Sequence, residues 1–241
     1  MSEIICGDVL EELKRMDDES VDLVITSPPY NLLNSTGSSL RSGTSFKWKN
    51  AQIQNGYKSH KDSMKREDYV EWMRECIAEM FRVLKPNGAI FFNHKFRVQG
   101  GLMEGHPFLD GFNVRQMIIW ARAGGFNFND TYFLPTYEVI YLMPKTAKGK
   151  DAFRLKKGAN RKTDIWRITQ ELKNPHPAPF PVQLVDNILE SCEVGTVLDP
   201  FGGSGTVGVS AIKNGWDYIL IDNSPEYCEM AKKRIEGEIN G

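Results

Sequence analysis

Short apolar runs alternate along this chain with helical patterns, and the alternation constrains the fold more than any other feature. Seven runs are expected as strands: Ile4–Cys6, Val21–Thr26, Ala89–Phe92, Met117–Ala121, Tyr137–Met143, Thr196–Asp199 and Tyr218–Asp222. Helices are expected between them, at Glu67–Leu84, Val182–Cys192, Val207–Lys213 and Pro225–Ile235. Strands that alternate with helices predict an α/β fold with a doubly wound, mostly parallel sheet. Ligands of such sheets bind beyond the carboxyl ends of the strands, so functional residues are expected directly after strands.

The composition is that of an ordinary globular protein. The chain has 241 residues, of which 41% are hydrophobic and 25% charged, and this excludes a disordered or low-complexity chain. No apolar run approaches the roughly 20 residues that a membrane-spanning helix needs, and the first residues lack the pattern of a secretory signal. The four cysteines form no CxxC pair and the histidines show no metal-like spacing, so no metal site is expected. We therefore expect a single domain over residues 1–241 in the reducing cytoplasm.

Two long polar stretches carry much of the positive charge. Residues 31–66 contain seven Lys or Arg and one acidic residue, and residues 145–162 contain eight and one. The whole chain has a net charge of −1, so the remainder is acidic. Long loops in compact domains are usually functional. We predict that the variable loops at about 31–66 and 145–172 bind the phosphates of DNA.

A glycine-rich turn directly follows one expected strand and opens an expected helix. It reads Asp199-Pro200-Phe201-Gly202-Gly203-Ser204-Gly205-Thr206. Glycines let backbone approach a ligand closely, and a helix start offers free N–H groups; no Lys follows, as one would in a phosphate-binding P-loop. Asp222 ends the next strand, where an acid can bind ribose hydroxyls. The pattern predicts a nucleoside cofactor, and the alternative is a turn built for tight packing with Asp222 as a surface cap.

Ser27-Pro28-Pro29-Tyr30 closes another expected strand. Prolines stiffen the chain and donate no backbone hydrogen bond, so the carbonyls of Ser27 and Pro28 are held out as fixed acceptors. With the Ser27 hydroxyl and the flat ring of Tyr30, the segment could grip an exocyclic amino group while stacking its ring. The alternative is a strand that prolines terminate, with Tyr30 in the core.

Together these two segments resemble the hallmark motifs of the amino-methylating DNA methyltransferases, which use S-adenosylmethionine. The motif order, with SPPY first and DPFGGSGT near the C-terminus, is that of the circularly permuted β group, and the resemblance covers most of the chain. It implies a Rossmann-like methyltransferase fold and catalytic roles for Ser27, Pro28, Pro29 and Tyr30. The cofactor-binding residues that it implies are Asp8, His176, Pro177, Asp199, Phe201, Gly202, Gly203, Ser204, Gly205, Thr206 and Asp222.

The resemblance also implies a reaction and partners. A base flipped out of double-stranded DNA would stack on Tyr30 while Ser27 and the Pro28 carbonyl hold its amino group for methylation. Because the ring face is invoked, loss of the Tyr30 hydroxyl is expected to be mild. Serine at the first motif position favours cytosine N4, with adenine N6 as the alternative. An RNA methyltransferase and a non-catalytic DNA-binding module are rival functions. The family implies a homodimer, whereas a cognate restriction endonuclease cannot be inferred from the sequence.

Overall fold

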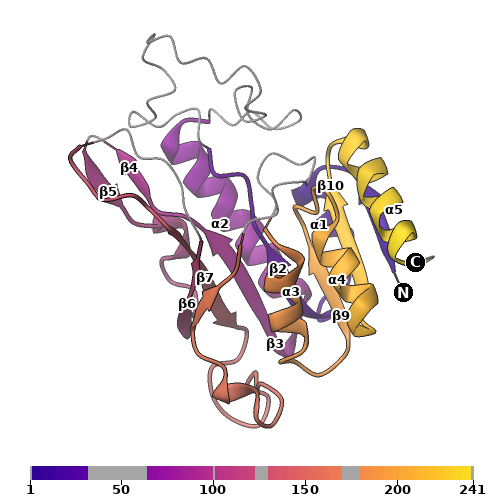
Figure 1. The fold of residues 1–241 in the computed structure, drawn as a ribbon. Coiled ribbons are helices and arrows are strands. Elements are labelled where there is room, and N and C mark those ends of the chain that lie inside the picture. Colours follow the sequence, from indigo (N-terminus) through magenta and orange to yellow (C-terminus); the bar gives the residue numbers. More distant parts are fainter. Residues whose placement is uncertain (1, 32–63, 100, 123–129, 170–179, 240–241) are drawn as a thin grey trace.

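A large mixed sheet forms the centre of the computed structural model, which describes residues 2–31, 64–99, 101–122, 130–169 and 180–239 (Figure 1). The strands of this sheet are β1 (Glu3–Cys6), β2 (Val21–Thr26), β3 (Leu84–His94), β6 (Gln116–Ala121), β7 (Tyr137–Pro144), β8 (Ile165–Arg167), β9 (Thr196–Asp199) and β10 (Asp217–Asp222). Their spatial order is β1-β10-β9-β2-β3-β7-β6-β8. A separate hairpin pairs β4 (Arg97–Gln99) with β5 (Leu102–Glu104).

Most neighbouring strands of the sheet run parallel. The joins from β1 through β10, β9 and β2 to β3 are all parallel, and so is the join of β6 to β8. Strand β7 runs antiparallel to both of its neighbours, β3 and β6. The predicted α/β fold with a mostly parallel sheet is therefore confirmed.

Helices cover both faces of the sheet, as a doubly wound fold requires. The helices are α1 (Val9–Arg15), α2 (Arg66–Val83), α3 (Val182–Leu189), α4 (Thr206–Asn214) and α5 (Pro225–Ile239), with short 3-10 turns at Pro107–Leu109 and Ala159–Arg161. Apolar residues of α3, α4 and α5 pack in one cluster, and those of α1 and α2 pack in a second. Alternate residues of β2 divide between the two clusters, with Leu23 and Ile25 in the first and Val24 in the second. Among the described helices, none is long and apolar enough to cross a membrane.

The chain leaves the two central strands in opposite directions. Strand β9 continues through α4 to β10 on one side, whereas β2 continues through α2 to β3 on the other. Strands β9 and β2 are themselves neighbours, with Leu23 opposite Val197. Open α/β sheets bind their ligands at such a reversal, so a crevice is expected at the carboxyl ends of these two strands.

The structure adds elements that sequence periodicity missed. Helix α1 spans only seven residues, too few for a clear periodic signal, and is begun by Asp8, whose carboxylate caps it. Strand β3 begins five residues before Ala89 because Pro86-Asn87-Gly88 lies within the strand, where its register with β2 shifts. A side chain at Gly88 would come within 2.6 Å of the Asp22 carbonyl oxygen, so the close approach of the two strands requires glycine there.

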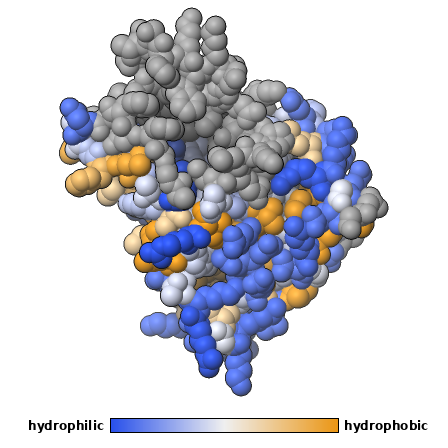
Figure 2. All heavy atoms as spheres, viewed as in Figure 1, coloured by the Kyte–Doolittle hydropathy of each residue, from blue (hydrophilic) through white to orange (hydrophobic). Residues whose placement is uncertain are grey.

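The basic stretch 145–162 lies away from the carboxyl ends of the parallel strands. Because β7 is antiparallel to β3, it delivers the chain to the opposite edge, where the Lys145 N–H donates to the Gly88 carbonyl. Figure 1 shows this segment at the lower end of the sheet, and Figure 2 shows hydrophilic side chains gathered there. The seven residue steps from Glu138 to Lys145 span about 23 Å of strand. The binding of DNA phosphates by residues 145–162 stays a prediction, and residues 32–63 and 170–172 lie outside the described residues.

Replacing Gly205 by Ala tests the close packing of the glycine turn on α5. Gly205 has φ +78°, and a Cβ there would lie 2.7 Å from Ala231 Cβ. Gly215 has a similar φ of +70° but opens onto free space, so Gly215→Ala is a matched control. We expect Gly215→Ala to lower the free energy of unfolding by about 1 kcal/mol, and Gly205→Ala by about 1–3 kcal/mol more. Urea unfolding measures both, and equal losses would contradict the close contact.

Candidate functional site

Residues from four separate stretches of the chain meet at one edge of the sheet. Asp8 follows β1, Ser27–Tyr30 follow β2, Asp199 ends β9 and Asp222 ends β10. Because these strands are parallel neighbours, their carboxyl ends meet at the same edge. The structure therefore brings together all the predicted site residues that it describes; His176 and Pro177 lie outside the described residues.

The buried carboxyl group of Asp199 joins the two central strands at this edge. Its Oδ1 atom accepts a hydrogen bond of 2.7 Å from the Thr26 hydroxyl and one of 3.1 Å from the Phe201 N–H. The residue is 1% exposed, and burial raises the pKa of its carboxyl group to about 7, although both hydrogen bonds act in the opposite direction. Asp199 Oδ1 thus holds the end of β2, which precedes the SPPY motif, and the glycine turn in a fixed relative position. This role of Asp199 is structural.

Asp222 shapes the glycine turn from the neighbouring strand. Its Oδ2 accepts the Gly203 N–H at 2.9 Å and its Oδ1 accepts the Ser224 N–H at 2.8 Å. Burial raises the pKa of this carboxyl group above its usual range. The Gly202 N–H donates to the Ile221 carbonyl, which holds the turn against β10. Each carboxylate oxygen has a further lone pair, so Asp222 can support the turn and still accept hydroxyl donors.

Two side chains of the turn already have partners within the protein. Arg234 of α5 donates to the Ser204 carbonyl and hydroxyl oxygens, at 2.7 and 2.8 Å, and reaches the Thr206 hydroxyl at 3.4 Å. Ser204 and Thr206 are both buried. Their side chains therefore fasten the turn to α5, and each hydroxyl keeps a hydrogen that it could donate to a cofactor. The Phe201 ring lies edge-on to Trp72 of α2, with 5.7 Å between ring centroids.

Asp8 has a structural role beside the predicted one. Its Oδ1 accepts the N–H groups of Leu10 and Glu11 and caps α1. The Gly7 N–H donates to the Asp222 carbonyl, so these two acidic residues stand at adjoining strand ends. Asp8 is exposed, and its second oxygen can accept a donor from a ligand.

Tyr30 is buried, with 5% of its surface exposed, and its hydroxyl group is held by several partners. The hydroxyl lies 2.8 Å from Ser27 Oγ, donates to Glu138 Oε2 at 3.2 Å and accepts from Asn93 Nδ2 at 2.9 Å. The ring packs against His94, with 4.7 Å between centroids. Loss of the Tyr30 hydroxyl would remove these hydrogen bonds, so a larger effect is expected than the role of the ring face alone predicts, and this effect stays untested. The stacking of a base on Tyr30 stays a prediction.

The two proline carbonyls of the motif differ in their surroundings. The Tyr69 hydroxyl of α2 donates to the Pro29 carbonyl at 2.8 Å and lies 3.1 Å from His94 Nε2. The Pro28 carbonyl takes no hydrogen bond from the described residues. Tyr69 of α2 thus holds the Pro29 carbonyl in place, while the Pro28 carbonyl oxygen stays available to a donor.

Sequence reasoning missed three polar residues beneath this motif: Asn93, Arg122 and Glu138. Glu138 and Asn93 are 7% and 3% exposed, and Arg122 lies within 3.3 Å of Glu138 Oε1. A signal was present, because Glu138 is a carboxylate in a strand that otherwise reads as buried on both faces. Charged residues are almost never buried without partners, so Glu138 was a candidate for a buried polar cluster near the site.

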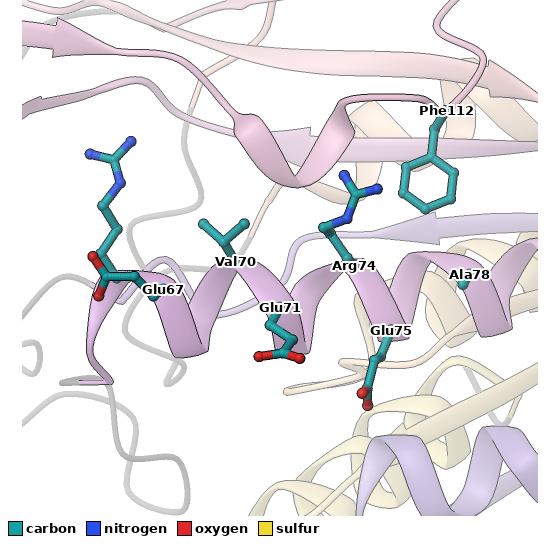
Figure 3. A pocket seen from close by; sticks show the side chains of 8 residues that line it. Glu67, Val70, Glu71, Arg74, Glu75, Ala78 and Phe112 are labelled. Carbon is teal, nitrogen blue, oxygen red and sulfur yellow. The ribbon is translucent and has the colours of Figure 1, made fainter.

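A separate groove lies along the exposed side of α2 (Figure 3). It encloses about 630 Å³, and Glu67, Glu71 and Glu75 line it together with Arg74 and Phe112. The three carboxylates outnumber the two arginines of the lining, Arg66 and Arg74, so the groove does not favour a phosphate backbone. None of the residues that line the groove belongs to the strand-end site.

Comparisons with known proteins agree with this geometry. A sequence model described as DNA methylase, of the N6/N4 methyltransferase type, matches residues 21–233. The chain belongs to this DNA methylase family. The type II methyltransferase M2.DpnII of Streptococcus pneumoniae is 30% identical over 98% of this chain and 90% of its own length. The DNA adenine methyltransferase YhdJ of Escherichia coli (strain K12) is 29% identical over 97% of this chain and 82% of its own length.

Solved structures confirm the methyltransferase fold. The cytosine-N4-specific PvuII DNA methyltransferase matches with a TM-score of 0.72 and 20% identity, over 99% of this chain and 90% of that one. A DNA modification methylase of Thermus thermophilus, solved in complex with S-adenosyl-L-methionine, matches with a TM-score of 0.70 and 24% identity, over 100% and 96%. Because the chain belongs to the DNA methylase family, it is a DNA amino-methyltransferase that uses S-adenosylmethionine, as its motifs predict.

Asp199→Asn should remove a pH dependence of the methyltransferase's stability. Because the pKa of Asp199 is raised from 3.8 to about 7, folding favours the protonated carboxyl group, and wild type loses stability as the pH rises through this range. We expect the free energy of unfolding of wild type, relative to Asp199→Asn, to fall by about 2–3 kcal/mol between pH 5 and pH 8. Urea unfolding of both proteins measures it, and a difference independent of pH would contradict the raised pKa.

Proposed function

We propose that this methyltransferase binds S-adenosylmethionine at the ends of β1, β10 and β9, and a flipped DNA base at the end of β2. The observation that carries the proposal is the hydrogen bond from Thr26 to Asp199, which sets the SPPY motif beside the glycine turn. A methyl donor on one side and an amino group on the other would then meet at the crevice between β9 and β2.

The residues around the glycine turn suit the chemical groups of this cofactor. Asp222 offers carboxylate oxygens to ribose hydroxyls, and the exposed Asp8 offers an acceptor to the amino group of the adenine. Gly203 has φ +49°, a conformation that glycine adopts readily. Because glycine has no side chain, the backbone of the turn is open where the ligand would approach. Helix α4 begins directly after the turn and directs its free N–H groups toward this edge. When bound, the cofactor supplies an electrophilic methyl group on a positively charged sulfur.

Ser27 and Pro28 suit the task of holding an exocyclic amino group. The two hydrogens of the amino group need two acceptors, and Ser27 Oγ and the Pro28 carbonyl oxygen supply them. Accepting both hydrogens favours a tetrahedral nitrogen, whose lone pair is then less delocalised into the ring and more nucleophilic. The prolines keep the acceptors rigid, which lowers the entropic cost of aligning the amino group.

For the target base we propose adenine N6, with cytosine N4 as the second candidate. Adenine is favoured by the likeness to the adenine methyltransferase YhdJ over nearly the whole chain. Cytosine is favoured by Ser27 at the first position of the motif. Because the base must leave the duplex to reach the motif, double-stranded DNA is the proposed substrate. The homodimer that the family implies stays a prediction.

One incubation separates these candidates. The purified chain is mixed with methyl-labelled S-adenosylmethionine and genomic DNA that lacks methylated bases, and the DNA is digested to nucleosides for mass spectrometry. Label in N6-methyl-2′-deoxyadenosine supports the first candidate, and label in N4-methyl-2′-deoxycytidine supports the second. Label found only when RNA replaces DNA would overturn the proposed substrate.

Asp222→Ala tests the assignment of the cofactor site. Loss of a charged hydrogen bond to ribose should weaken binding of S-adenosylmethionine by about 1–3 kcal/mol, measured by calorimetry. Asp217→Ala, at the exposed start of the same strand, is the matched control and should bind normally. Asp222→Asn keeps the size of the side chain, and its one oxygen can still accept the N–H of Gly203 or of Ser224 but not both, so it should loosen the turn less than Asp222→Ala does. Unchanged affinity in Asp222→Ala would remove this residue from the site.

Ser27→Ala tests the assignment of the amino-group site. Because Ser27 would contact the amino group and not the cofactor, turnover should fall by about tenfold or more while cofactor affinity stays near that of wild type. Turnover is measured with saturating S-adenosylmethionine and DNA, and affinity by calorimetry. Equal losses in turnover and cofactor affinity would indicate that Ser27 contacts the cofactor and would contradict its assignment to the amino group.

A further inference from the structure

A buried carboxylate lies behind the residue that would hold the substrate's amino group. Glu138 of β7 accepts hydrogen bonds at Oε2 from the Tyr30 hydroxyl, at 3.2 Å, and from Asn93 Nδ2, at 2.9 Å. Its Oε1 lies 3.3 Å from Arg122 Nη1. The guanidinium compensates the buried charge, so the carboxylate faces Tyr30 with acceptor atoms only.

An acceptor-only carboxylate determines where the neighbouring hydroxyl hydrogens point. Tyr30 has one hydroxyl hydrogen, and a charged acceptor attracts it more strongly than the neutral Ser27 hydroxyl does. Once this hydrogen points to Glu138, the oxygen of Tyr30 can only accept from Ser27, 2.8 Å away. The Ser27 hydrogen therefore points inward, away from the crevice.

Asn93 reinforces this direction. Its Nδ2 has two hydrogens, and Glu138 Oε2 and Tyr30 Oη both lie 2.9 Å from it. Asn93 Nδ2 is 3.3 Å from Ser27 Oγ, so it is a weaker partner there. The two described residues that hydrogen-bond Ser27 Oγ are therefore a donor, Asn93, and a hydroxyl already directed toward Glu138, Tyr30.

We propose that Glu138 is a positioning residue that acts through Tyr30 to present the lone pairs of Ser27 Oγ to the amino group of the substrate. The proposal rests on the proposed function, because it assumes that Ser27 accepts a hydrogen from that amino group. Hydrogen bonds in a chain polarise one another, and a chain that ends in a carboxylate makes its first oxygen a stronger acceptor. Ser27 therefore gains part of the acceptor strength of a carboxylate without being one.

A merely structural role for Glu138 makes a different prediction. Glu138 could serve only to satisfy Asn93 and Arg122 in the core, and its removal would then lower stability without a specific effect on turnover. In the proposed role, removal acts through Tyr30 and leaves the cofactor side of the crevice intact. The effect on turnover should therefore depend on whether Tyr30 has a hydroxyl group.

The test compares Glu138→Gln, Tyr30→Phe and the double variant. The amide of Glu138→Gln keeps the shape but directs an N–H donor toward Tyr30 when its oxygen faces Arg122, which reverses both hydroxyls. We expect Glu138→Gln and Tyr30→Phe each to lower kcat by about tenfold, with unchanged affinity for S-adenosylmethionine. In the Tyr30→Phe background, Glu138→Gln should lower kcat by less than about twofold. Glu71→Gln, an exposed carboxylate in the groove of α2, is the matched control and should leave kcat unchanged.

Each outcome bears on the proposal. A kcat of Glu138→Gln close to that of wild type, or the same fold loss with and without the Tyr30 hydroxyl, would overturn it. If Glu138→Gln does not fold, Tyr30→Phe decides alone, since a kcat near that of wild type excludes the relay. Wild-type methyl transfer is measured first in the same assay. A wild type that binds the cofactor but methylates no DNA contradicts the proposed function, whereas an active wild type with an active Glu138→Gln contradicts only the role of Glu138.

Discussion

The buried carboxyl group of Asp199 is the interaction on which the arrangement of the site depends. Burial of an unpaired carboxylate is costly, and here Thr26 and the Phe201 N–H offset that cost at a single oxygen atom. Thr26 and Asp199 are separated by 173 positions along the chain, yet their hydrogen bond fixes the end of β2, and with it the SPPY motif, relative to the glycine turn. A displacement of either strand end would leave polar groups unpaired in the core, so the spacing of the two half-sites is rigidly held.

Chain order is unimportant for such a site, because the sheet brings strand ends together in space. Ser27–Tyr30 precede the glycine turn along the chain, but β2 and β9 are adjacent in the sheet. The cofactor side depends in the same way on β1 and β10, whose ends are joined by the Gly7–Asp222 hydrogen bond. A permuted motif order therefore changes the connections between elements and leaves the crevice unchanged.

The sequence was sufficient to predict seven of the eight strands of the large sheet and the motifs that follow them, because both are local patterns. The three-residue strands β4, β5 and β8 are too short to give such a pattern. It was insufficient where long-range geometry decides. The antiparallel direction of β7 is not visible in its apolar run, and this direction carries residues 145–162 to the far edge of the sheet. The same strand places Glu138 opposite Trp120 and beneath Tyr30, contacts between residues far apart in sequence. The hydrogen bonds from Arg234 of α5 to Ser204 and Thr206 are long-range contacts of the same kind, and the contact of these two residues with a ligand stays a prediction.

The buried Glu138 behind Ser27 also changes what a serine at the first motif position implies about the target base. An acid at the first motif position would accept the hydrogen of the amino group directly, and serine is a weaker acceptor in its place. Here Glu138 stands two hydrogen bonds from Ser27 Oγ, through the Tyr30 hydroxyl. Polarisation along this chain reduces the difference in acceptor strength between serine and an acid. The residue at this position alone is therefore a poor guide to the base, and the shape of the pocket around the flipped ring has to distinguish adenine from cytosine.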